Sequence, residues 1–163
     1  MTPNRILVSY ATRHGSTREV AERIAQTLRD RGFAVDVMPA DEVGLLRGYA
    51  AVVLGGALYT GRLHKDARSF LARNREALSV RSVAVFAMGP RTLDPADVAS
   101  SRAQLDRALG DVSPVAVAIF GGVVKPETLR FPFNRMPALD ARDWDAIDAW
   151  ASQLFAPASV ARP

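Results

Sequence analysis

The stretch Ile6-Leu7-Val8-Ser9-Tyr10-Ala11-Thr12-Arg13-His14-Gly15-Ser16-Thr17 indicates a strand that turns directly into a helix. Its first five residues are mostly apolar and β-prone, and from Ser16 to Arg31 the apolar residues recur at helical spacing. Gly32 follows at a position where glycine commonly ends a helix. This strand–loop–helix unit predicts that the chain begins an α/β fold.

The same alternation continues along the chain. Further strands are predicted over 33–37, 50–56, 82–88 and 114–120, and helices over 41–47, 65–78, 94–109 and 140–155. The run Ala50–Gly56 is continuously apolar, which is typical of a strand covered on both faces. Five such strands predict a parallel sheet with helices on both faces and a ligand site at the carboxyl ends of the strands.

Length and composition limit the possible classes of protein. With 163 residues, of which 48% are hydrophobic and 23% charged, the chain is predicted to form one globular domain over 1–155 and a flexible tail over 156–163. The absence of cysteine excludes disulfides, zinc–thiolate sites, iron–sulfur clusters and thiol nucleophiles. No apolar run is long enough to span a membrane and the first residues carry no signal-peptide pattern, so we expect a cytoplasmic protein.

The charge balance is basic, with a formal net charge of +4, and arginine supplies 19 of the 21 basic residues. These residues are scattered and form no block with interleaved aromatics, so nothing supports nucleic-acid binding. The two histidines, His14 and His64, have no partner at metal-ligand spacing, and no metal site is predicted.

The loop Thr12–Thr17 has the chemistry of a phosphate cradle. Hydroxyl side chains stand at both of its ends, Gly15 lies between them, and the loop opens into a helix whose first amides favour an anion. The loop has neither the Gly-Lys-Ser/Thr of a Walker loop nor a Gly-x-Gly-x-x-Gly dinucleotide signature. The alternative is an ordinary turn in which Ser16 or Thr17 only caps the helix.

At this loop the chain resembles the flavodoxin family, which holds the phosphate of FMN with a Ser/Thr-x-Thr-Gly-x-Thr type loop. The matching residues are Thr12, Arg13, His14, Gly15, Ser16 and Thr17. The resemblance implies FMN as cofactor and a three-layer sandwich whose five-stranded parallel sheet has the strand order 2-1-3-4-5.

Three stretches resemble the menaquinone-dependent protoporphyrinogen oxidase subgroup of that family: Ala11–Thr17, Val53–Lys65 and Asp143–Trp150. This resemblance implies an FMN-dependent oxidoreductase that oxidises protoporphyrinogen and passes electrons to a quinone. The region that corresponds to 124–139 is longer in that subgroup.

Two further loops are implied to contact the isoalloxazine ring. The first supplies Ala57, Leu58, Tyr59, Thr60 and Gly61, and the second supplies Met88, Gly89, Pro90 and Arg91. Tyr59 either stacks on the flavin or covers the helix that follows. Gly121 and Gly122 either line the pocket or only form a turn.

Four residues in or beside these loops are expected to form a basic rim: Arg62, His64, Lys65 and Arg91. One cation about 7 Å from the ring contributes on the order of 2 kcal/mol at an effective dielectric near 20, which corresponds to nearly 100 mV for one electron. Such a rim favours the reduced flavin and two-electron exchange with an organic partner. The alternative is a set of solvated surface charges.

Two other functions fit the same loops: a flavodoxin-type electron carrier that serves a redox protein, and a binding module for another phosphorylated ligand such as a deazaflavin. The basic and apolar stretch 124–139 either grips an anionic aromatic substrate, touches a membrane surface peripherally, or crosses over the sheet edge. No side chain is predicted to be an acid–base catalyst, and the oligomeric state stays open.

Overall fold

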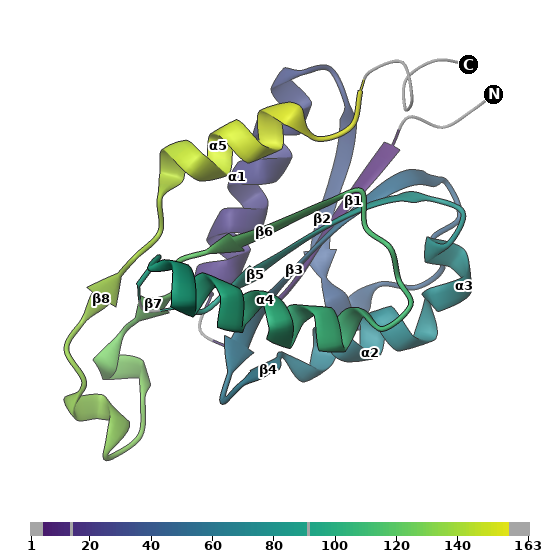
Figure 1. Ribbon diagram of the computed structural model, residues 1–163. Coiled ribbons are helices and arrows are strands. Elements are labelled where there is room, and N and C mark those ends of the chain that lie inside the picture. Colours follow the sequence, from purple (N-terminus) through teal and green to yellow (C-terminus); the bar gives the residue numbers. More distant parts are fainter. Residues whose placement is uncertain (1–4, 14, 91, 157–163) are drawn as a thin grey trace.

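Five parallel strands form the centre of the molecule in the computed structural model, which describes residues 5–13, 15–90 and 92–156 (Figure 1). These strands are β1 (Arg5–Ala11), β2 (Ala34–Pro39), β3 (Tyr49–Tyr59), β5 (Ser82–Met88) and β6 (Ala116–Phe120). Their order in the sheet is β2-β1-β3-β5-β6, and every neighbouring pair is parallel. With the long strands counted in chain order, this confirms the predicted order 2-1-3-4-5.

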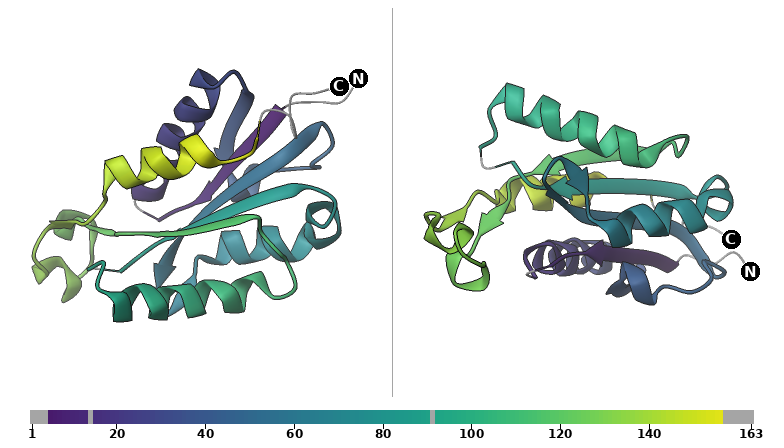
Figure 2. Two further views of the ribbon diagram at one scale, coloured as in Figure 1. Left: turned by 45° about the horizontal axis from the view of Figure 1, so that its top comes forward. Right: turned by 90° about the horizontal axis from the view of Figure 1, so that it is seen from below.

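Helices cover both faces of the sheet and make three layers. The helices α1 (Ser16–Asp30) and α5 (Trp144–Gln153) lie on one face, and α2 (Lys65–Arg73) and α4 (Pro95–Leu109) lie on the other (Figure 2). The alternation of side chains along β1 separates two cores, because Ile6 and Val8 face α1 while Leu7 faces the opposite layer.

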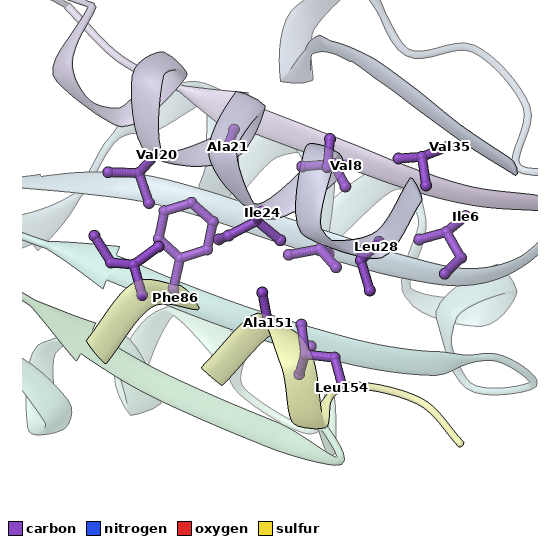
Figure 3. Packing of buried hydrophobic residues seen from close by; sticks show 14 of the residues in the cluster. Ile6, Val8, Val20, Ala21, Ile24, Leu28, Val35, Phe86, Ala151 and Leu154 are labelled. Atoms are coloured by element: carbon purple, nitrogen blue, oxygen red, sulfur yellow. The ribbon is translucent and has the colours of Figure 1, made fainter. Parts of the chain in front are cut away.

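The apolar stripe of α1 explains why this helix packs where it does. Val20, Ile24 and Leu28 are fully buried at i, i+4 and i+8. They pack in the same core cluster as Ala151 of α5 and Leu154, the residue after α5 (Figure 3). Burial of each large side chain contributes about 1.5–3 kcal/mol. The stripe therefore fixes the start of α1 against the end of β1.

Three predicted helices differ from the structure. The helix predicted over 41–47 is only the 3₁₀ turn η1 (Ala40–Glu42), since Gly44 follows and weakens a helix. The helix predicted over 65–78 breaks at Asn74, whose buried side chain donates to the carbonyl of Phe70, and continues as α3 (Arg75–Leu78). The last helix begins at Trp144 rather than at 140, because Leu139–Asp140 forms the short strand β8.

Short strands that the sequence did not predict lie at the carboxyl ends of the sheet. β3 turns back into β4 (Arg62–Leu63) through Thr60 and Gly61, whose φ values of 47° and 82° are those of a tight two-residue hairpin. β7 (Val123–Val124) pairs antiparallel with β8, and the 3₁₀ turns η2 (Pro126–Thr128) and η3 (Phe133–Arg135) lie between them.

We call residues 123–140 the hairpin segment. It extends beyond the carboxyl end of β6, at the side of the molecule where α5 begins (Figure 1). Between its two short strands the segment is irregular apart from η2 and η3, and it projects from the end of the sheet (Figure 1).

Several arginines bind backbone carbonyls of distant segments. Arg81 donates to the carbonyls of Tyr49 (2.9 Å), Ala77 (2.6 Å) and Leu46 (3.1 Å). Arg31 donates to the carbonyls of Ala151 and Phe155 at the end of α5. Part of the arginine excess thus joins segments of the fold.

Among the described residues, no helix has both the length and the apolar character needed to cross a membrane. Residues 157–163 of the predicted tail lie outside the described residues, as do His14 and Arg91.

Candidate functional site

A cavity of about 360 Å³ opens at the carboxyl ends of the strands. It is lined from the loops after β1, β3, β5 and β6 and from the hairpin segment. The lining residues are Arg13, Ser16, Ala57, Leu58, Tyr59, Thr60, Met88, Gly89, Gly122, Val123, Val124, Lys125, Leu129, Met136 and Leu139. The cavity thus lies at the edge of the sheet where ligands of parallel α/β folds generally bind.

The loop after β1 is folded as an open helix start. Gly15 is the N-cap of α1 with φ 90°, and its N–H donates to Oγ1 of Thr12 (3.1 Å). The first bond of the helix ladder runs from the Glu19 N–H to the Gly15 carbonyl (3.2 Å), so the amides of residues 16–18 have no acceptor within the helix. The alternative that Ser16 or Thr17 only caps the helix is wrong, because the capping position belongs to a glycine.

Thr17, at the end of the loop, has an unused hydroxyl, and the residue lies behind Ser16 rather than in the lining of the cavity. Its side chain is fully buried, and its Oγ1 has no hydrogen-bond partner among the described residues. A buried hydroxyl without a partner costs about 1–3 kcal/mol, so its position calls for an acceptor. A bound phosphate beside Ser16 would supply one, and its oxygens would also accept from the first amides of the helix, where the helix dipole favours an anion.

Ser9 on β1 has the second buried hydroxyl without a partner in the described part of the chain. Nothing in the structure gives it a ligand role.

Tyr59 joins the first loop to the second. Its hydroxyl accepts from the backbone N–H of Arg13 (3.3 Å), and the Arg13 guanidinium lies 5.3 Å from the centroid of its ring. Burial raises the pKa of the Tyr59 phenol, so this hydroxyl is protonated at neutral pH. The ring lines the cavity, while its stacking on a flavin stays a prediction.

His64 is not part of a cationic rim. It is the N-cap of α2, its Nδ1 accepts from the N–H of Asp66 (3.0 Å), and its ring meets Tyr59 edge-on at 6.0 Å. Burial lowers the pKa of the imidazole despite Asp66 nearby. The expectation of a positive His64 is therefore wrong, because the accepting nitrogen carries no proton.

The charges at the cavity come from other residues. Among the described residues, which do not include Arg91, the cations that line it are Arg13 and Lys125, whereas Arg62 and Lys65 lie outside its lining. The expected basic character of the site is present, but the loop after β1 and the hairpin segment supply it.

Replacing His64 by asparagine is expected to reduce the pH dependence of stability. The wild-type imidazole is neutral in the folded protein above pH 6.5, its ordinary pKa, and the unfolded chain takes up the proton first as the pH falls. The free energy of unfolding should therefore decrease below that pH. His64→Asn keeps a capping acceptor and should flatten this dependence between about pH 7 and 5. Urea unfolding at several pH values measures it, and equal slopes for both proteins would contradict the neutral cap.

The inner end of the cavity is apolar and closely packed. Leu58 and Met88 line it, and Gly89 lies so close to Leu58 that a Cβ atom on the glycine would be 2.7 Å from Cβ of Leu58. Gly122 lines the same space, which confirms one of the two roles considered for it. Of the predicted ring-contacting residues, Pro90 and Gly61 instead line a smaller cavity of about 310 Å³ next to the first.

Sequence reasoning named the segment 124–139 without assigning it a place in the pocket. In the structure, its residues form a wall of the cavity, together with Val123 of the same hairpin. The wall residues are Val123, Val124, Lys125, Leu129, Met136 and Leu139. The sequence signal for this wall was the mixture of basic and apolar residues in the segment. The wall residues come together only because Val124 pairs with Leu139, and this pairing joins residues far apart in the sequence.

Comparisons with known proteins agree with this geometry. A family model described as flavodoxin domain matches residues 7–136. A search of curated proteins found no match.

Solved structures resemble the fold over most of the chain. The flavodoxin of Streptococcus pneumonia TIGR4 has a TM-score of 0.62 at 18% identity, covering 92% of this chain and 97% of that one. A flavoprotein from Lactobacillus acidophilus NCFM in complex with FMN has a TM-score of 0.54 at 12% identity, covering 73% of this chain and 93% of that one.

The rubredoxin oxygen:oxidoreductase of Desulfovibrio gigas is similar in one part. Its TM-score is 0.58 at 15% identity, with 94% of this chain covered. The present chain spans only 36% of the length of that protein. At these identities the likeness concerns the fold alone.

Proposed function

Because the chain belongs to the flavodoxin domain family, we propose that it is an FMN-dependent oxidoreductase that exchanges electrons with an anionic organic partner at the cavity. The observation that carries this proposal is the continuity of one cavity. It runs from the cradle residues Arg13 and Ser16 to the apolar residues Leu58 and Met88. A ligand with a phosphate at one end and a flat apolar ring at the other fits that sequence of surfaces.

The residues of the cradle fit the phosphate of FMN. The hydroxyl of Thr12 holds the turn at Gly15, which leaves the next amides directed away from the helix. Thr17 can donate its unused hydroxyl to a phosphate oxygen, and Arg13 adds a positive charge at the edge of the cavity. These contacts bind the cofactor without a metal ion.

Bound FMN supplies the redox chemistry, while the protein binds and orients it and excludes water. The cavity volume of about 360 Å³ lies near the lower end of ligand pockets, roughly 300–1,000 Å³. A cavity of this volume accommodates one ligand of the size of FMN, so a second reactant must meet the flavin at the mouth of the cavity. Arg13 adds a positive charge to the lining of the cavity, which favours an anionic partner, whereas the charge of Lys125 is paired with Glu19 (3.6 Å).

Within this class we propose a reaction of the protoporphyrinogen oxidase type, with a quinone as electron acceptor. The support is the motif resemblance at Ala11–Thr17, Val53–Lys65 and Asp143–Trp150. A second support is the combination of apolar side chains with Arg13 and Lys125 at the cavity.

A flavodoxin-type electron carrier is the second candidate. Two observations favour it: the cavity has room for a single ligand, and nearly the whole chain superimposes on the Streptococcus flavodoxin. In that case the partner is a redox protein that contacts the flavin edge.

Anaerobic mixing of the FMN-loaded protein with protoporphyrinogen separates the two candidates. We expect the absorbance of the oxidised flavin to bleach, porphyrin fluorescence to rise in step, and added menadione to restore the flavin absorbance. Free FMN at the same concentration is the control for uncatalysed exchange. If the bound flavin does not respond to either small molecule beyond this control, the protoporphyrinogen oxidase proposal is wrong and the result favours the electron carrier.

A further inference from the structure

Arg142, between β8 and α5, is a charged residue with an unusually enclosed side chain. Only 7% of that side chain is exposed. Its guanidinium donates to both carboxylate oxygens of Asp140, with Nε–Oδ1 at 2.9 Å and Nη2–Oδ2 at 2.7 Å. This two-point contact holds the pKa of Asp140 below its ordinary value and fixes the guanidinium at the end of β8.

The same guanidinium reaches the first turn of α1. Its Nη1 lies 3.4 Å from Oε2 of Glu19 and 3.5 Å from the carbonyl oxygen of Ser16. The guanidinium also lies 4.8 Å from the centroid of Trp144, at the start of α5. One side chain therefore contacts β8, α1 and α5.

Glu19 receives a second cation from the other strand of the hairpin. Nζ of Lys125, the residue after β7, lies 3.6 Å from Oε1 of Glu19. Lys125 after β7 and Arg142 after β8 thus both pair with the Glu19 carboxylate, which lies on the first turn of α1 beside the phosphate cradle.

These contacts join opposite walls of the cavity. Val123, Val124 and Leu139 belong to the strand pair and line the cavity on one side. Ser16, whose carbonyl oxygen is near Arg142, lines it on the other. The ion pairs of Arg142 and Lys125 with Glu19 therefore join the hairpin to the start of α1.

We propose that Arg142 is a positioning residue that holds the β7–β8 wall against the start of α1 and thereby sets the fit of the cavity to its ligand. The inference rests on the proposed function, because the ligand used to test it is FMN. Arg142 contacts no reacting atom and acts through the wall that it holds.

A control variant is available at an ion pair between α1 and α5. Arg23 of α1 binds both carboxylate oxygens of Asp148 on α5 (2.8 and 2.7 Å) and lies 5.6 Å from the centroid of the same Trp144 ring. Arg23 does not line the cavity. Arg23→Gln therefore removes a two-point ion pair and an aromatic contact, at a side chain that is 49% exposed, without releasing the hairpin.

Isothermal titration with FMN should separate the two arginines. We expect Arg142→Gln to weaken FMN binding about tenfold or more, and Arg23→Gln to change it by less than about twofold. In a Glu19→Gln background the Arg142→Gln effect should shrink, since the partner that transmits it is gone. Unchanged affinity in Arg142→Gln, or equal losses for both arginine variants, would overturn the proposal.

Hydrogen exchange of the ligand-free proteins tests the positioning role without FMN. The amides of residues 123–125 and 139–141 should exchange at least several-fold faster in Arg142→Gln than in wild type, and at the wild-type rate in Arg23→Gln. If the wild-type protein binds no FMN, the proposed function fails while this comparison still decides the role of Arg142. Equal exchange of the hairpin in all three proteins would refute that role.

Discussion

Thr17→Val is expected to weaken FMN binding by roughly 10- to 100-fold while it makes the ligand-free protein more stable. The two effects have one cause. In the ligand-free protein the buried Oγ1 of Thr17 has no partner among the described residues, and removing such a hydroxyl relieves a cost of about 1 kcal/mol or more. In the complex the same hydroxyl is expected to donate to a phosphate oxygen, and a hydrogen bond to a charged group contributes about 1.5–3 kcal/mol. Valine has nearly the same shape, so the packing around position 17 is kept.

Titration calorimetry with FMN and thermal unfolding of the ligand-free proteins measure the two effects. Thr27→Val is the matched control, because Thr27 lies on the same helix and its hydroxyl already donates to the carbonyl of Arg23 (3.2 Å). That variant should bind FMN like wild type and should not gain stability. A Thr17→Val protein that binds FMN with unchanged affinity would show that this hydroxyl does not serve the phosphate.

Gly121→Ala is expected to destabilise the fold by about 2–3 kcal/mol and to abolish most FMN binding. A Cβ atom at this position would lie 2.1 Å from the carbonyl oxygen and 2.6 Å from the carbonyl carbon of Ala141. These are backbone atoms, which cannot rotate away as the end of a side chain can. The connection from β6 to β7 must therefore separate from the connection between β8 and α5, and the bond from the Ala141 N–H to the Gly122 carbonyl (2.9 Å) must lengthen or break.

The loss of binding follows because the displaced strands carry one wall of the cavity. Urea unfolding gives the stability change, and flavin fluorescence quenching gives the affinity. Gly44→Ala is the control, since its Cβ atom would meet nothing within 4 Å. Wild-type stability in Gly121→Ala would mean that the two connections are not packed as described.

Local sequence patterns were sufficient to predict the architecture. The apolar residues of α1 recur at the helical period, and β5 is predicted at its observed bounds, Ser82–Met88, because its run is short and apolar. The turn from β1 into α1 was also predictable, since it depends on the consecutive residues Thr12–Thr17, while phosphate binding there stays a prediction. In each of these cases the residues that decide the structure are neighbours in the chain.

Features that depend on contacts between distant residues were missed. His64 was expected to be a cation, but its protonation is set by burial and by the N–H of Asp66 at the helix start. The wall of the cavity was missed because it requires the pairing of Val124 with Leu139 and the ion pair of Arg142 with Glu19. No local periodicity encodes either contact.

We expect the start of α1 to bind the phosphate of FMN. Titration of the wild-type protein with FMN and with riboflavin, which lacks the phosphate, under the same buffer conditions tests it most directly. Open amides at a helix start, an unused hydroxyl and Arg13 should together make FMN bind about 100-fold or more tightly than riboflavin. Equal affinities for the two compounds would contradict the claim.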